Sequence, residues 1–103
     1  MEYTLDIYSR QPEQLMELMA RNCKARRLEK GYSRRTFSEM TGIPAPTLER
    51  FEKTGKISLE SFCKIVVELG YFNEMSVILS KPKFTTGAEL EIINRNKKRQ
   101  RGR

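Results

Sequence analysis

Histidine and tryptophan are absent from this chain of 103 residues, and cysteine occurs only twice, as Cys23 and Cys63. Without histidine, the chain lacks the commonest general base and the commonest metal ligand. Two cysteines alone are too few for a zinc site of Cys and His ligands. The sequence also offers no nucleophile–base set and no phosphate-binding loop. We therefore expect neither an enzyme nor a protein that binds a metal or a cofactor.

Long apolar runs are missing as well. The longest have three residues, as in Ile65-Val66-Val67, and are far too short to span a bilayer. The first residues contain two acids and lack the basic start and apolar run of a signal peptide. We therefore expect a cytoplasmic protein without membrane contact, in which the thiols stay reduced. Because Cys23 and Cys63 each fall among apolar residues at helical spacing, both are predicted to lie in the core.

Basic residues outnumber acidic ones by 20 to 13, giving a net charge of +7, and they gather in two regions. Residues 21–56 carry ten bases against four acids, and residues 94–103 carry six bases and no acid. Two separate basic regions predict a polyanion as partner. RNA stays open as that partner, because Arg-rich tails bind either nucleic acid.

Apolar spacing and turn residues predict an all-α domain of five short helices over residues 12–80. Pro12 suits a first helical turn, and glycines end the helices that follow. Ser33 and Ser58 are expected N-caps of the second and fourth helices. Periodicity predicts that the core is made by Leu15, Met16, Met19, Cys23, Phe37, Met40, Thr41, Leu48, Phe51, Leu59, Phe62, Ile65, Val66 and Leu69.

Two terminal segments flank this domain. Residues 1–11 form an N-terminal arm, in which the alternation from Tyr3 to Tyr8 predicts a short strand that a partner chain could pair. Residues 81–103 form a linker and a basic C-terminal tail. Thr86 and Glu89 have the spacing of a capping box, which predicts a polar helix over 87–98.

The stretch from Ser33 to Gly55 combines two short helices with a tight turn between them. Ser38 is small at the place where the helices approach, and Gly42 tolerates the positive φ of the turn. Apolar residues at Phe37, Ile43, Leu48 and Phe51 hold the pair together. This set is typical of a helix-turn-helix.

From about Met19 to Leu79 the chain resembles the phage Cro/repressor type of helix-turn-helix domain, also called the xenobiotic-response-element type. The match includes ARRLEKGYS, the helix-turn-helix and ISLESFCKIVVELG. The resemblance implies a five-helix lambda-repressor-like domain that binds a double-stranded DNA operator as a homodimer. It also implies that Arg27 and Glu52 form a buried structural ion pair rather than a catalytic couple.

The resemblance further implies which residues contact DNA. Arg34 takes the place at the start of the second helix that often lies beside a phosphate or the outermost base. Arg50 faces the groove if Leu48 and Phe51 face the core, and an arginine there can bind guanine O6 and N7. Pro44, Ala45 and Pro46 depart from the family pattern; they could touch thymine methyls or favour shape readout. The full set is Arg34, Arg35, Pro44, Ala45, Pro46, Thr47, Arg50, Lys53 and Lys56.

The phrase LERFEKTGKISLESFCKIVVELG, followed by RNKKRQRGR, is similar to antitoxin-like regulators encoded beside HipA-type kinase toxins. This similarity implies a repressor that is also the antitoxin and autoregulator of a type II toxin-antitoxin operon. The alternative is a protein-interaction module that neutralises a partner toxin, with DNA binding secondary. A homodimer is expected because members of this family commonly dimerise and because four further apolar residues lie near the end of the domain: Phe72, Met75, Ile78 and Leu79. These residues could instead close the monomer core.

Overall fold

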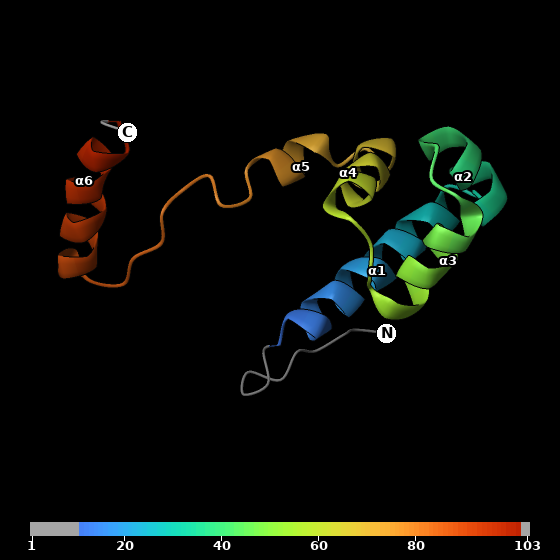
Figure 1. Ribbon diagram of the computed structural model, residues 1–103, viewed down its shortest axis with the longest axis horizontal. Coiled ribbons are helices and arrows are strands. Elements are labelled where there is room, and N and C mark those ends of the chain that lie inside the picture. The colour runs from blue at the N-terminus through green and yellow to red at the C-terminus, as the bar shows by residue number, and fades with distance from the viewer. Residues whose placement is uncertain (1–10, 102–103) are drawn as a thin grey trace. The chain divides into compact units, whose positions relative to one another are not determined.

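A computed structural model describes residues 11–101, and every regular element in that range is a helix (Figure 1). No strand occurs among these residues, which confirms the all-α class. The strand predicted over Tyr3 to Tyr8 lies outside the described residues. The helices are α1 (Pro12–Glu29), α2 (Arg34–Thr41), α3 (Ala45–Thr54), α4 (Leu59–Glu68), α5 (Phe72–Ser76) and α6 (Gly87–Arg101).

Two compact units make up the chain, residues 1–72 and 73–103. The domain expected from the sequence over residues 12–80 stays a prediction. Phe72, Ile78 and Leu79 are exposed, and α5 has no buried residue.

Local capping sets the ends of the helices in the first unit. The Ser33 hydroxyl accepts a hydrogen bond from the Thr36 amide at 3.0 Å and begins α2. The Ser58 hydroxyl accepts from the Ser61 amide at 3.1 Å and begins α4. Gly42 ends α2 with a φ of 78°, a left-handed conformation that glycine adopts without strain. The caps expected at Ser33 and Ser58 are therefore confirmed.

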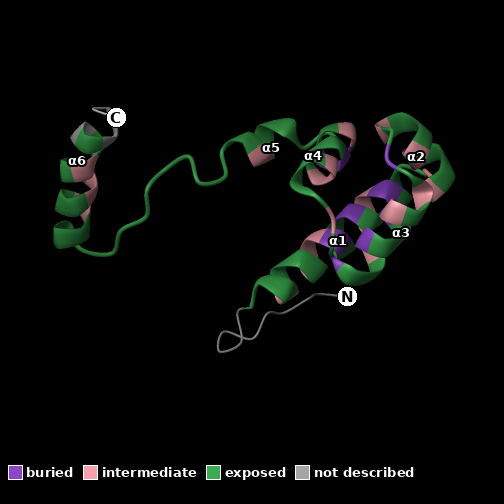
Figure 2. Cartoon of the chain, in the orientation of Figure 1, coloured by how far each residue is buried: buried purple, intermediate pink, exposed green. Residues whose placement is uncertain are grey.

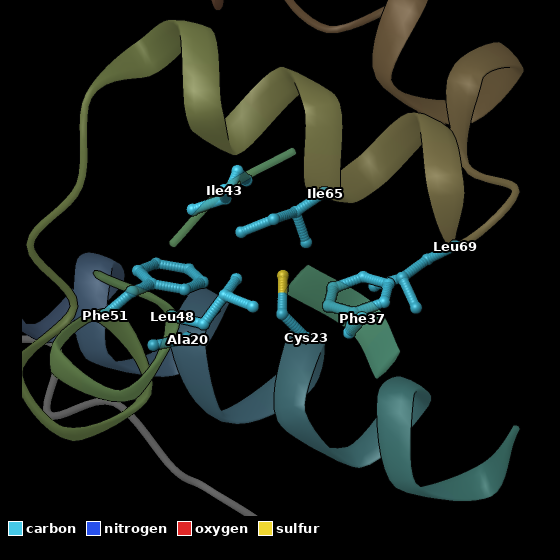
Figure 3. Packing of buried hydrophobic residues seen from close by; sticks show 8 residues of the cluster. All are labelled: Ala20, Cys23, Phe37, Ile43, Leu48, Phe51, Ile65 and Leu69. Atoms are coloured by element: carbon cyan, nitrogen blue, oxygen red, sulfur yellow. The ribbon is translucent and has the colours of Figure 1, made fainter. Parts of the chain in front are cut away.

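The core lies where α1, α2, α3 and α4 meet. α1 packs against α3, and Figure 2 shows buried stretches on both helices. Phe51 makes an edge-on contact with Phe62, with ring centroids 6.2 Å apart. Figure 3 shows the buried cluster, which consists of Ala20, Cys23, Phe37, Ile43, Leu48, Phe51, Ile65 and Leu69.

Five residues predicted for the core are exposed instead: Leu15, Met16, Met40, Leu59 and Cys63. Leu59 and Cys63 lie at four-residue spacing along α4 with Val67, on a side that the other described elements of the first unit leave exposed. The core-facing side of α4 is made by Phe62, Ile65, Val66 and Leu69. The prediction for Cys63 was wrong because the apolar residues of α4 form two stripes, and only one of them is buried. Cys23 is buried, as predicted.

The second unit contains α6, which begins at the expected residue and extends to Arg101 rather than 98. The Thr86 hydroxyl accepts from the Glu89 amide at 3.1 Å, as in a capping box. The Glu89 carboxylate accepts in return from the Thr85 amide at 2.9 Å. Much of the C-terminal tail is therefore helical.

Candidate nucleic-acid interface

Side-chain hydrogen bonds hold the turn between α2 and α3. The Gly42 amide donates to the Ser38 carbonyl at 2.8 Å and closes α2. The Ser38 hydroxyl donates to the Ile43 carbonyl, while the Thr41 hydroxyl accepts from the Ile43 amide at 3.2 Å. Ile43 itself is buried in the core. Three hydrogen bonds and the buried Ile43 side chain therefore hold the turn between α2 and α3.

A nearly buried cluster of charged side chains connects α3 to α1 and α2. Arg27 donates to Glu52 through Nε at 2.7 Å and through Nη2 at 3.0 Å, a two-point contact. Its Nη1 donates to the Tyr32 carbonyl at 2.6 Å. Both carboxylate oxygens of Glu52 accept hydrogen bonds. The contact expected between Arg27 and Glu52 is thus present, and it has the partners that a structural pair needs.

Arg34 joins the same cluster. Its Nε donates to Oε1 of Glu52 at 2.9 Å, while about a third of the side chain (36%) stays exposed. From the sequence, Arg34 was expected to contact DNA, and its bond to Glu52 was not predicted. Because Glu52 accepts from Nε, the guanidinium of Arg34 is held beside the Arg27–Glu52 pair.

The outer side of α3 presents most of the other predicted DNA contacts. Leu48 and Phe51 are buried, and Arg50 and Lys53 are exposed on the opposite side of the helix. Pro44 and Pro46 are exposed at the start of α3, where Ala45 and Thr47 are half-buried. A shallow hollow on this side is lined by Pro46, Glu49, Arg50, Lys53 and Thr54.

Arg35 and Lys56 lie at the two ends of this region. Arg35 is on α2, almost fully exposed, with only a long contact of 3.8 Å to Glu39. Lys56 follows α3, and its amide donates to the Thr54 hydroxyl at 3.1 Å. That hydroxyl donates in turn to the Arg50 carbonyl at 2.7 Å. The backbone at Lys56 is therefore tied to the last turn of α3.

Glu49 belongs to the same surface, although it was not among the residues predicted from the sequence. Lys53 lies one turn further along α3 and contacts the Glu49 carboxylate at 3.0 Å. The hydrogen bond from Lys53 lowers the pKa of the Glu49 carboxyl group. The four-residue spacing of an acid and a base was the signal in the sequence. Glu49 repels phosphate but can accept a hydrogen bond from cytosine N4.

A metal centre and a membrane span are two other kinds of site that a chain can contain. Among the described residues, no three His, Cys, Asp or Glu side chains gather as metal ligands do. No helix of the described range combines the length and the apolar character that a bilayer span requires.

Comparison with known proteins found no matching family model, no similar curated protein and no similar solved structure. What the chain does must therefore be argued from its own residues and their arrangement.

Proposed function

We propose that this chain is a sequence-specific DNA-binding repressor of the Cro/repressor type, acting in the cytoplasm. In this proposal α1 to α5 form a lambda-repressor-like domain, in which α2 and α3 are the helix-turn-helix. The recognition helix α3 enters the major groove of operator DNA. The resemblance of residues 19–79 to that family, with the two basic regions of the chain, supports the assignment.

One observation carries the proposal: α3 has a core side and a free basic side. Leu48 and Phe51 are buried, so Arg50 is held outward on a short helix whose position the Arg27–Glu52 contact restrains. A major groove admits one α-helix, and a rigid helix with an outward arginine matches the geometry of guanine recognition. Arg35 and Lys56, at the two ends of the region, are suited to contact phosphates beside the groove.

The antitoxin function is a second candidate, in which the chain neutralises a partner toxin such as a HipA-type kinase and DNA binding is secondary. The first turn of α3 favours it, because Pro44, Ala45 and Pro46 offer no side-chain hydrogen-bond donor to a base. If the chain is a repressor, these residues contact thymine methyl groups, or the helix-turn-helix recognises the shape of the DNA instead of base edges. Autoregulation of a toxin-antitoxin operon would combine both functions.

Selection from a random duplex library tests the repressor function. The full chain should enrich one sequence, and it should bind that duplex about a thousandfold or more tighter than a scrambled one at the same salt concentration. Arg35→Ala should weaken binding to both duplexes. Lys24→Ala removes one exposed charge from α1 and is the matched control. Failure to enrich any sequence, with equal affinity for every duplex, would favour the toxin-neutralising module.

A further inference from the structure

One side of α4 is apolar and is left exposed by the described residues of the first unit. Leu59, Cys63 and Val67 follow one another at four-residue spacing, and Leu59 and Val67 are 76% and 52% exposed. Met40, near the end of α2, is also exposed and lines the same groove. We call this region, from Met40 to the three α4 residues, the α4 groove. A contiguous apolar surface on a small domain marks an interaction site rather than scattered exposure.

Charged residues of alternating sign run along one edge of the α4 groove. Glu60, Lys64 and Glu68 recur at the same four-residue spacing, and all three line the groove. Within the chain, Lys64 reaches Glu60 only at 3.7 Å, a loose surface contact. This edge has one base and two acids, so it does not suit a polyanion such as DNA. An acid and a base one turn apart can form ion pairs with the same two residues on a second helix that runs antiparallel to the first.

We propose that the α4 groove is the interface between two copies of this chain, related by a twofold axis, with their α4 helices antiparallel. A twofold axis makes each contact occur twice, residue for residue. With the axis at the level of residue 62, Glu60 of each copy lies opposite Lys64 of the partner subunit. In the same register, Leu59 inserts between Cys63 and Val67 of the partner subunit.

Three features agree in this one register. The apolar stripes interdigitate, each copy forms reciprocal ion pairs, and the two Cys63 residues lie within about one helical turn of each other. A foreign partner would have to supply the complementary pattern, whereas a second copy already has it. Self-association through α4 does not depend on whether the chain binds DNA.

Sedimentation equilibrium of the full chain without DNA tests the interface. The wild-type chain should dimerise, and Val67→Glu should raise the dimer dissociation constant about tenfold or more, because it places a charge in the apolar stripe. Val77→Glu is the matched control, since Val77 is similarly exposed (62%) but lies in the second unit. Circular dichroism checks that both variants fold. A monomeric wild type, or a dimer that only Val77→Glu disrupts, overturns the proposal.

A charge exchange tests the register. Glu60→Lys and Lys64→Glu should each weaken the dimer, because both copies then present like charges to each other. A mixture of the two variants should recover a heterodimer of wild-type strength, since every pair is again opposite in sign. No gain on mixing overturns the register.

Cross-linking adds a readout that depends on distance. Mild oxidation should link the wild-type chain as a covalent dimer through Cys63, and Cys63→Ser should abolish the product. Buried Cys23 remains in that variant as an internal control. No link in the wild-type chain, or a link that persists in Cys63→Ser, contradicts the twofold contact.

Discussion

Arg27 and Glu52 are charged, yet their side chains are only 4% and 5% exposed, and they connect α1 to α3. A charge buried to this degree is tolerated when its hydrogen bonds are satisfied. Glu52 accepts hydrogen bonds from Arg27 and Arg34, and Arg27 also donates one to the Tyr32 carbonyl. The cluster therefore fixes the position of α3 through contacts that a purely apolar core would not supply.

Arg27→Ala should destabilise the fold by about 3 kcal/mol, because a buried carboxylate is deprived of its two-point partner and the Tyr32 carbonyl of its donor. Arg34→Ala is the comparison, and it should cost only about 1 kcal/mol since Arg34 is partly exposed and donates one bond. Chemical denaturation measures both. A loss below about 0.5 kcal/mol for Arg27→Ala would be the scale of an ordinary surface change and would remove the structural role.

Arg50 and Lys53 are neighbours on the outer side of α3 but should behave differently. Arg50→Ala should weaken binding to the selected duplex by about 1–3 kcal/mol and relax the preference at one guanine. Lys53→Ala should weaken binding to the selected duplex and to a scrambled duplex by similar factors, because a phosphate contact has no sequence information. Titration of both duplexes at one salt concentration separates the two. Equal effects of Arg50→Ala on both duplexes would make Arg50 a phosphate contact and favour shape readout.

Ionisation of the buried Cys23 thiol makes the free energy of unfolding depend on pH. Burial, with a smaller contribution from the charge of Glu52, raises the pKa of the Cys23 thiol from 9.0 to about 11. The folded state thus holds its proton more tightly than the unfolded state. The protonated thiol therefore favours the folded state fully below pH 9, and this contribution to stability disappears as the pH rises toward 11.

The free energy of unfolding of the wild-type chain should therefore fall between pH 9 and 11 relative to Cys23→Ala, by on the order of 2 kcal/mol. Denaturation of both proteins across this range measures the difference. Subtracting the variant removes the titration of lysines and tyrosines, which both proteins share. Parallel curves would show that the thiol does not titrate differently on folding.

At the scale of elements, two glycine turns of nearly identical backbone differ in their surroundings. Gly42 and Gly55 have φ of 78° and 79° and end α2 and α3. A Cβ at Gly42 would meet nothing within 4 Å, whereas a Cβ at Gly55 would lie 2.7 Å from the carbonyl carbon of Met16. Gly55 therefore lets the end of α3 pack directly on the backbone of α1.

Gly42→Ala should cost about 1–2 kcal/mol, which is the penalty of a left-handed conformation for alanine. Gly55→Ala should cost a further 1–3 kcal/mol or so, because the new methyl group must push the α1 backbone away. Thermal or chemical denaturation of the pair gives the difference directly. Equal destabilisation by the two substitutions would mean that the packing of α3 on α1 relaxes freely.

At the scale of the whole molecule, positive charge is divided between residues 21–56 and residues 94–103, each with a net +6. The first region includes α3 and its flanks, and the second makes up the last turns of α6 and the C-terminus. Basic residues at the C-terminal end of a helix also interact favourably with its dipole. This second basic region suits the nucleic-acid partner that we propose.

Deleting residues 94–103 should lower the affinity of the chain for every DNA sequence to a similar degree. The slope of log affinity against log salt should become shallower by about 0.9 for each phosphate that these residues neutralise in the full chain. Anisotropy titrations of the selected and scrambled duplexes, each at several salt concentrations, measure this slope. An unchanged slope would assign the basic end to a protein partner or to solubility.

Several features could be predicted from the sequence because they depend on residues close together in the chain. Ser33 and Ser58 cap helices whose amides lie three residues away, and Gly42 adopts a conformation that its own lack of a side chain permits. The inward side of α3 followed from the three-residue spacing of Leu48 and Phe51. The division of charge is a property of composition and order alone.

Only the tertiary structure decided which apolar stripe is buried and which charges meet. α4 has apolar residues on two sides, and packing against α2 and the core leaves Leu59, Cys63 and Val67 outside. Arg34 reaches Glu52 across 18 residues of sequence, a pairing that periodicity cannot reveal. Local patterns specify helices and their ends, but burial and long-range pairing depend on how many neighbours the folded chain brings to each side.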